Sequence, residues 1–280
     1  MRIASIQLEG RPVYGRVDGD QIVVADAGLL ARYPSLADLL AADAVAEMGV
    51  ADGFKIPVAD ASFNPVIPLP GKIICVGINY RAHMKEMGHG EPDYPVLFTR
   101  FPDTMVGSGQ PLVRPRNSDN YDYEGELALV IGRTAHHVAA ADALSHVAGY
   151  TCLMDGSLRD YQKHGSQFTP GKNFHRSGAM GPWLVTSDEI RDPTALNLET
   201  RLNGEVMQSA PVSDLKFDIP YLIEYISGFS KLEPGDVIST GTPAGVGFAR
   251  DPQVWLTPGD TLEVEIDGIG VLVNPVAAED

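Results

Sequence analysis

The sequence predicts a mainly β, α+β protein in which an antiparallel sandwich, roll or barrel follows a small amino-terminal lobe. Many short β-like runs are separated by glycine and proline turns, and helical stretches are few. Strands and helices do not alternate regularly, which disfavours a doubly wound parallel sheet. The chain has 280 residues, 44% of them hydrophobic, and a chain of this length buries roughly three-quarters of its unfolded surface without disulfides.

The first seventy residues are expected to form the small α+β lobe. Its strands are expected at residues 2–8, 13–17 and 22–25, the last two joined through the hairpin signal Asp18-Gly19. Ser35 precedes an apolar stretch at 36–40 and is a favoured helix cap, and Asp38 would lie in the first turn. We therefore expect one short helix after the hairpin.

A proline-rich segment is expected to separate the lobe from the rest of the chain. Residues 64–71 read Asn-Pro-Val-Ile-Pro-Leu-Pro-Gly, too rich in proline for a helix or a central strand. We place the boundary there, with a lobe at 1–70 and a catalytic domain at 71–280. Strands of the second domain are expected at 72–76, 126–131, 183–186, 195–202, 237–240, 261–266 and 271–273, and helices at 80–87, from 140, at 157–164 and at 219–229.

Composition and charge exclude several classes of partner. The formal net charge is -16, which repels phosphate backbones and anionic membrane surfaces, so we expect neither a nucleic-acid nor a membrane partner. No apolar stretch approaches the roughly 20 residues that span a bilayer. Cys75 and Cys152 lie far apart in apolar stretches and suggest buried free thiols in a reducing cytoplasm rather than a disulfide or zinc site.

Two glutamates suggest a metal site. Glu124 and Glu126 share a strand face because side chains alternate with period two, and that row continues into Ala128 and Val130. A solvated strand face is the usual explanation of such a pair, and Glu263 and Glu265 have that character because their row contains no apolar residue. Burying two like charges is expensive without a cation, so we expect a divalent metal at Glu124 and Glu126.

Asp155 could supply a third oxygen ligand. It stands where a helix is expected to begin, so a capping role is the alternative. Arg159 and Gln162, four and seven residues further on, would project from one side of that helix and could hold a substrate. Three carboxylates without a nearby Cys or His favour Mg²⁺, with Mn²⁺ or Ca²⁺ as alternatives, over zinc.

Three further segments carry candidate site residues. His83 and Glu86 are neighbours on a short helix, and an imidazole oriented by a carboxylate can take a proton from water, although a surface ion pair is the alternative. Lys172 follows turn residues, where its ammonium can face a cleft; a solvated loop lysine is the alternative. The backbone amides and hydroxyls around Gly241 and Thr242 could hold a carboxylate, or form only a tight turn.

Taken together, these segments resemble the fumarylacetoacetate hydrolase family, from Gly71 to about Pro275. They stand in the family's order: Val76-Gly77-Ile78-Asn79-Tyr80 with His83 and Glu86, then Asp122-Tyr123-Glu124-Gly125-Glu126-Leu127, then Asp155 with Ser157-Leu158-Arg159-Asp160, then Gly171-Lys172-Asn173-Phe174, then Gly241-Thr242-Pro243-Ala244-Gly245-Val246-Gly247. The resemblance implies a β-sandwich roll catalytic domain behind a small lobe, in a homodimer.

The resemblance also implies roles for individual residues. Metal ligands would be Glu124, Glu126 and Asp155; catalytic residues would be His83, Glu86 and Lys172; and substrate-binding positions would be Arg159, Gln162, Gly241 and Thr242. Family members commonly carry Asn before and a bulky apolar residue after the third ligand, where this chain has Met154 and Gly156. Where relatives often show lysine before proline, this chain has Arg100, whose forked guanidinium suggests a different carboxylate or oxygen contact; we count Arg100 among the substrate-binding positions.

The implied activity is metal-dependent hydrolysis of a carbon–carbon bond in a small anionic 2,4-dioxo acid, such as an acylpyruvate or a fumarylacetoacetate-like compound. The metal would bind the 2-oxo acid end, His83 held by Glu86 would activate the attacking water, and Lys172 would stabilise the oxyanion. Alternatives within the family are a 2-oxo acid decarboxylase, an isomerase and a sugar-acid dehydratase. A non-catalytic metal-binding β module is a lower-ranked alternative, because it gives His83, Lys172 and Arg159 no role.

Overall fold

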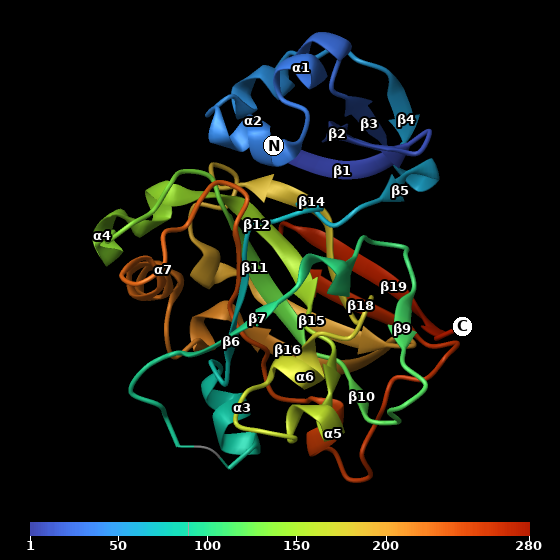
Figure 1. The fold of residues 1–280 in the computed structure, drawn as a ribbon, viewed down its shortest axis with the longest axis vertical. Helices are drawn as coiled ribbons and strands as arrows, with labels where there is room; N and C mark the ends of the chain where they lie inside the picture. Colours follow the sequence, from blue (N-terminus) through green and yellow to red (C-terminus); the bar gives the residue numbers. More distant parts are fainter. Residues whose placement is uncertain (89) are drawn as a thin grey trace.

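A computed structural model describes residues 1–88 and 90–280, and most of its strands belong to one large sheet (Figure 1). The order in that sheet is β4-β3-β2-β1-β14-β12-β11-β17-β6-β7, with β5 paired to β1 and β8 to β14. The bounds are β1 Arg2–Leu8, β2 Arg11–Asp18, β3 Gln21–Val24, β4 Lys55–Pro57, β5 Ser62–Phe63, β6 Ile73–Gly77, β7 Val96–Arg100, β8 Met105–Val106, β11 Gly125–Ile131, β12 Val147–Met154, β14 Gly178–Thr186 and β17 Val237–Ser239.

A second sheet packs against the first, and a short two-stranded ladder lies beside both. The second sheet has the order β16-β15-β18-β19-β9, with bounds β16 Glu205–Pro211, β15 Asn197–Leu202, β18 Thr261–Ile266, β19 Gly270–Ala278 and β9 Leu112–Arg114. The ladder pairs β10 Tyr121–Asp122 with β13 Ser157–Leu158. Pairing is antiparallel except for β17–β6, β14–β8 and β19–β9, so the predicted mainly β, largely antiparallel architecture is confirmed.

The helices are short and lie around the sheets (Figure 1). The α-helices are α1 Ala27–Arg32, α2 Leu36–Ala41, α3 Arg81–Glu86, α4 Ala140–Ala143, α5 Arg159–Gln162, α6 Thr169–Lys172 and α7 Ile219–Ser227, and 3-10 turns occupy Val45–Gly49, Val58–Asp60, Pro102–Thr104, Leu144–His146, Pro193–Ala195, Val212–Asp214 and Gly247–Ala249. Among the described residues, no helix is long and apolar enough to cross a membrane.

The amino-terminal segment contains the expected hairpin and capped helix, together with a helix, α1, that the sequence pattern did not predict. Ser35 caps α2 and forms a reciprocal capping box with Asp38, and β2 and β3 form the expected hairpin. The lobe is joined to the remainder by pairing of β1 with β14, in which Arg2 lies opposite Val185 and Ile3 opposite Leu184. Because one sheet runs through both parts, the division at residue 70 stays a prediction.

The helix expected at 157–164 is present but shorter than expected, and the expectation was wrong for its first two and last two residues. Ser157 and Leu158 form β13 instead, with Leu158 opposite Tyr121, and the helix is confined to Arg159–Gln162. Pairing with a strand distant in sequence therefore overrides the local helical pattern. Asp155 does not cap α5, whose N-cap position is Leu158, so the capping alternative for Asp155 is also excluded.

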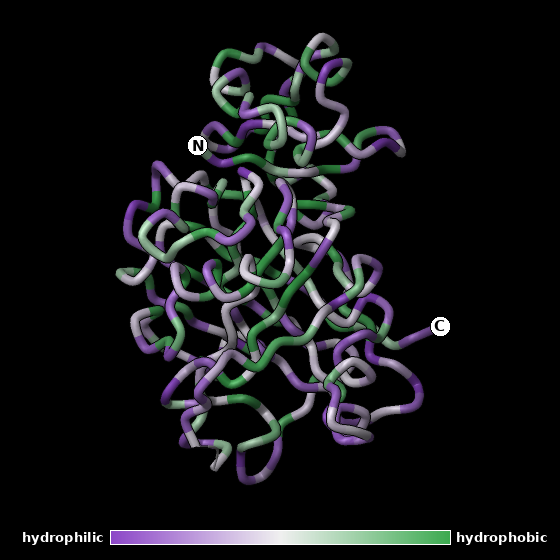
Figure 2. The backbone as a smooth tube through the Cα atoms, turned by 60° about the vertical axis from the view of Figure 1, so that its left-hand side comes forward, coloured by the Kyte–Doolittle hydropathy of each residue, from purple (hydrophilic) through white to green (hydrophobic). Residues whose placement is uncertain are grey.

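The central strand β11 separates two hydrophobic clusters, and its alternation positions the site. Leu127, Leu129 and Ile131 belong to the cluster between the two sheets. Ala128 and Val130 point to the opposite face and pack in the cluster shared with the lobe. The most hydrophobic segments run through the interior and the most hydrophilic ones through the outer loops (Figure 2). The Glu126 side chain lies on the same face of β11 as Ala128 and is therefore buried.

Candidate active site

Three carboxylates converge at one end of β11. Glu124 precedes β11, Glu126 lies on it, and Asp155 follows the paired strand β12. Their ligand atoms all lie within 4.8 Å of one another, and each residue is at most 5% exposed. The amide of Asp155 donates to the carbonyl oxygen of Glu124 at 2.9 Å. The ladder between β11 and β12 thus fixes the spacing of the acidic cluster.

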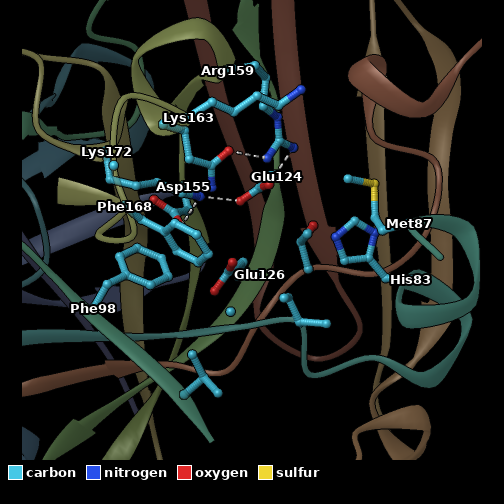
Figure 3. Close-up of a pocket in the computed structure, with 16 residues that line it drawn as sticks. His83, Met87, Phe98, Glu124, Glu126, Asp155, Arg159, Lys163, Phe168 and Lys172 are labelled. Atoms are coloured by element: carbon cyan, nitrogen blue, oxygen red, sulfur yellow. Dashed lines mark hydrogen bonds and ion pairs between the residues drawn. The ribbon is translucent and has the colours of Figure 1, made fainter. Parts of the chain in front are cut away.

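Basic side chains surround two of these carboxylates (Figure 3). Lys172 Nζ lies 2.5 Å from Glu124 Oε2 and 2.7 Å from Asp155 Oδ2. Arg159 reaches the other oxygen of Glu124 at 2.5 Å, and Arg100 Nη1 lies 2.6 Å from Asp155 Oδ1. Glu124 and Asp155 are therefore neutralised by basic groups.

Glu126 differs from its two neighbours because it has no basic partner among the described residues. Its Oε2 accepts hydrogen bonds from Ser239 Oγ at 2.5 Å and from the Gly241 amide at 2.9 Å. Burial, together with the charges of Asp155 and Glu124, raises the pKa of Glu126 well above its usual value. A positive charge beside Glu126 would remove that electrostatic penalty.

The pKa of Glu124 moves in the opposite direction. Burial alone would raise it, but Arg159 and Lys172 outweigh burial and lower the pKa of Glu124 to about 2. Burial likewise opposes the charged form of Lys172, yet Asp155 and Glu124 raise the pKa of its ammonium above the ordinary value. Both groups are charged at neutral pH.

The donor set fits a hard divalent cation. Glu124, Glu126 and Asp155 offer oxygens only, and oxygen ligands are those that Mg²⁺, Mn²⁺ and Ca²⁺ prefer. The buried carboxylate of Glu126 lacks a basic partner, and ligating carboxylates need hydrogen-bonded support, which Ser239 and Gly241 supply. These three residues could hold the metal, and Lys172 would then lie beside it.

A pocket of about 380 Å³ opens over the acidic cluster. Its lining includes the apolar side chains of Val76, Ile78, Met87, Phe98 and Phe168. His83 lies on the opposite side of the cluster from Phe98 and Lys172 (Figure 3). The cavity can therefore hold a small molecule between the acidic cluster and an imidazole.

His83 and Glu86 form the pair that the sequence predicted. His83 is 5% exposed, and its Nδ1 lies 2.9 Å from Glu86 Oε2. The other Glu86 oxygen accepts from the Gly245 amide at 2.8 Å, which ties α3 to the glycine-rich loop. A proton on Nδ1 satisfies this contact and leaves Nε2 as the ring nitrogen for a ligand. The buried position of His83 argues against a mere surface ion pair.

The predicted substrate-binding residues divide into two groups. Arg159, Gln162 and Thr242 line the pocket, and Arg159 Nη1 donates to Gln162 Oε1 at 3.0 Å. Gly241 is not among the lining residues, and its amide donates to Glu126 Oε2. The carboxylate contact expected for Gly241 is thus made within the protein.

Arg100 is also placed away from the pocket. Its side chain is fully buried behind Asp155 and donates to the Gly156 carbonyl at 2.9 Å and to Ser177 Oγ at 2.7 Å. With these partners the guanidinium cannot reach a substrate in the cavity. Arg100 thus contacts Asp155 and does not line the pocket, which disagrees with the substrate contact expected for it.

Sequence reasoning missed three polar residues that organise the site. Asp122 accepts from Arg159 Nε at 2.8 Å and from the amides of Gly247 and Phe248. Gln208, on the second sheet, bonds to the strand that carries the glutamates. Lys163 lines the pocket with its Nζ 4.0 Å from the ring centre of Phe248. Asp122 stands in the same family motif as Glu124 and Glu126, which could have indicated it, whereas nothing local marks Gln208 or Lys163.

The β-rich fold, the buried acidic cluster that could bind a divalent metal and the histidine–glutamate pair are those of an enzyme acting on small acids. Residues 72–277 match the family described as "Fumarylacetoacetate (FAA) hydrolase C-terminal". The chain belongs to the fumarylacetoacetate hydrolase family, and it is an enzyme of that family.

Two similar relatives are named as oxaloacetate tautomerases. The chain is 42% identical over 223 residues to "Oxaloacetate tautomerase FAHD2A, mitochondrial" of Homo sapiens, covering 79% of this chain and 71% of the relative. It is 43% identical over 228 residues to "Oxaloacetate tautomerase YisK" of Bacillus subtilis, covering 80% and 75%.

Solved structures extend the similarity over the whole chain. A putative HpcE protein from Mycobacterium smegmatis shares 36% identity with a TM-score of 0.87, with 100% of both chains covered. The maleylpyruvate hydrolase from Sphingobium sp. SYK-6, in complex with manganese (II) ion and pyruvate, shares 28% identity with a TM-score of 0.80, again with 100% of both covered. The relatives thus include tautomerases and a hydrolase.

Proposed function

We propose that this chain is a divalent-metal-dependent tautomerase that interconverts the keto and enol forms of a small 2-oxo dicarboxylic acid of the oxaloacetate type. The observation that carries the proposal is that His83 and the cluster of Glu124, Glu126 and Asp155 line one pocket. The names of relatives at 42% and 43% identity supply the reaction and substrate class.

The acidic cluster would hold the cation beside the 2-oxo acid group of the substrate. When bound to Glu124, Glu126 and Asp155, the metal supplies Lewis acidity at the 2-oxo acid group, which makes the adjacent carbon–hydrogen bond more acidic. Lys172, buried beside Glu124 and Asp155, adds positive charge close to the oxygen that becomes negative.

His83 would carry the proton. Its Nε2 takes a proton from carbon 3, the electron pair of that carbon–hydrogen bond forms the double bond between carbons 2 and 3, and the 2-oxo oxygen becomes the enol hydroxyl when a proton returns to it. No proton is gained or lost overall. Glu86 holds Nδ1 at 2.9 Å and stabilises the imidazolium during transfer.

Lys163 supports a substrate with a second carboxylate. The pocket-lining cations Arg159 and Lys172 already have carboxylate partners, but no ion pair joins Lys163 to another residue in the described parts of the chain. Its ammonium is held against the Phe248 ring, an attractive cation–π arrangement. A carboxylate at the far end of the substrate would find an unpaired cation there.

The second candidate is hydrolysis of a carbon–carbon bond in a 2,4-dioxo acid. A histidine oriented by a carboxylate also suits activation of water, as in the His83–Glu86 pair, and one relative is named as a maleylpyruvate hydrolase. Decarboxylation, another isomerisation or sugar-acid dehydration would use the same metal site. A non-catalytic metal module ranks below these because it leaves the buried His83 without a function.

The metal, assembly and location belong to the proposal as well. Mg²⁺ remains our first choice, and Mn²⁺ is supported by the manganese complex of a relative. The homodimer remains a prediction. So does the cytoplasmic location, since a relative at 42% identity is named as mitochondrial.

One assay separates the two leading reactions. Metal-stripped protein is supplied with Mg²⁺ or Mn²⁺ and given freshly dissolved oxaloacetate, whose enol absorbance is followed, and in parallel an acylpyruvate, whose products are identified. We expect metal-dependent acceleration of keto–enol exchange, lost in His83→Gln. Release of pyruvate from the acylpyruvate without any effect on oxaloacetate exchange would replace the tautomerase with the hydrolase.

A further inference from the structure

Gln208 links the second sheet to the strand that carries the glutamates. It lies on β16, is 1% exposed, and sits opposite Thr200 of β15. Its Oε1 accepts from the Gly125 amide at 3.0 Å. Its Nε2 donates to Thr242 Oγ1 and to the Pro243 carbonyl, both at 2.8 Å. All of these contacts lie outside the pattern of the β-ladders.

These bonds close into a ring. Thr242 Oγ1, which accepts from Gln208, itself donates to the Gly125 carbonyl at 2.9 Å. The backbone amide and carbonyl of Gly125 are therefore both held by the ring of Gly125, Gln208 and Thr242. Because every polar group in it has a partner, the ring stabilises one arrangement of its members.

The ring holds the backbone between the two glutamates of the acidic cluster. Gly125 separates Glu124 from Glu126, so its two peptide planes set the direction of both side chains. The second sheet also approaches closely there, since a Cβ on Gly125 would lie 2.1 Å from Thr200 Oγ1. Thr242 lines the pocket. One buried amide thus connects the expected metal ligands to the substrate-facing wall.

We propose that Gln208 is a positioning residue that fixes the spacing of the Glu124 and Glu126 carboxylates relative to Thr242, and thereby sets the affinity of the site for a divalent cation. The proposal rests on the metal site described under Proposed function, but not on which reaction the enzyme catalyses. Groups that orient metal ligands commonly change metal affinity by about 10- to 100-fold when they are replaced.

The test measures Mn²⁺ binding to metal-stripped protein by calorimetry, without substrate. Gln208→Met keeps the size of the side chain and removes all three hydrogen bonds, and it is expected to weaken Mn²⁺ binding by about tenfold or more. Thr200→Val is the matched control, because this hydroxyl is equally buried, lies in register with Gln208 and has no hydrogen-bond partner among the residues that the structure describes. It is expected to leave Mn²⁺ affinity within about twofold.

A double-mutant cycle of Gln208→Met and Thr242→Val distinguishes a positioning effect of Gln208 from a general loss of stability. Thr242→Val opens the same ring at another corner, so the double variant is expected to bind Mn²⁺ no more weakly than Gln208→Met alone. If Gln208→Met does not fold, Thr242→Val must still weaken Mn²⁺ binding by itself.

Three results would count against this inference in different ways. Wild-type affinity in Gln208→Met, an equal loss in Thr200→Val, or fully additive losses in the cycle would each overturn it while leaving the metal site intact. Absence of Mn²⁺ binding by the wild-type protein would overturn it together with the metal site. If the Mn²⁺ affinities follow the prediction but the enzyme does not tautomerise oxaloacetate, only the proposed reaction is contradicted.

Discussion

Replacing Arg100 with methionine tests the placement of this side chain behind Asp155. Arg100 and Asp155 both have fully buried side chains and form an ion pair at 2.6 Å. Arg100→Met removes the basic partner of Asp155 Oδ1 and leaves Lys172 as the remaining partner at Oδ2; loss of one member of a buried pair destabilises a protein by about 3–5 kcal/mol. For a chain of this size, roughly 2 °C of melting temperature corresponds to each kcal/mol, so we expect Arg100→Met to melt about 6–10 °C lower.

The assay is thermal unfolding of the metal-stripped protein, with Arg133→Met as the control. Arg133 pairs with Asp43 at 3.2 Å, but both side chains are exposed, and such surface pairs contribute at most about 1 kcal/mol. A melting temperature of Arg100→Met equal to that of the wild type, with a raised KM for substrate, would refute the buried positioning role and restore the substrate contact expected from sequence.

Three further predictions concern the pocket, the sheet packing and the thiols. Lys163→Met is expected to raise KM for a 2-oxo dicarboxylic acid by about fivefold, the equivalent of about 1 kcal/mol for an exposed pair, but not to raise KM for a 2-oxo monocarboxylic acid. Lys231→Met makes the same charge change elsewhere and should alter neither KM. An equal rise in KM for both acids would contradict the role of Lys163. Gly125→Ala is expected to lower the free energy of unfolding by about 1–3 kcal/mol, because the added methyl group overpacks against Thr200. Adding Thr200→Ala should recover part of that loss in denaturant titrations. Both cysteines are buried and burial raises the pKa of each thiol, so a thiol reagent should label neither until the protein unfolds; fast labelling under native conditions would contradict this.

Alternation along a strand was enough to find the two glutamates. The row of Glu124 and Glu126 continues into apolar residues, and β11 is buried along its whole length. The comparison row behaves differently, since the Glu263 and Glu265 side chains are 29% and 44% exposed and pair with Arg201. Period-two patterning therefore distinguishes a buried acidic pair from a solvated one.

Other features depended on contacts that the local sequence does not encode. The substrate contact expected for Arg100 rested on its position where relatives often show lysine before proline, yet its side chain pairs with Asp155, 55 residues away. Gln208 lies 83 residues from Gly125, and no periodicity relates the two. The helix expected at 157–164 begins two residues later for a similar reason, because Ser157 and Leu158 pair with Asp122 and Tyr121.

The most direct test of the metal site is anomalous diffraction from crystals of the protein grown with Mn²⁺. We predict one strong peak within about 2.0–2.6 Å of an oxygen from each of Glu124, Glu126 and Asp155. A saturated crystal with no peak among these three carboxylates, or with its manganese bound elsewhere, would contradict the account.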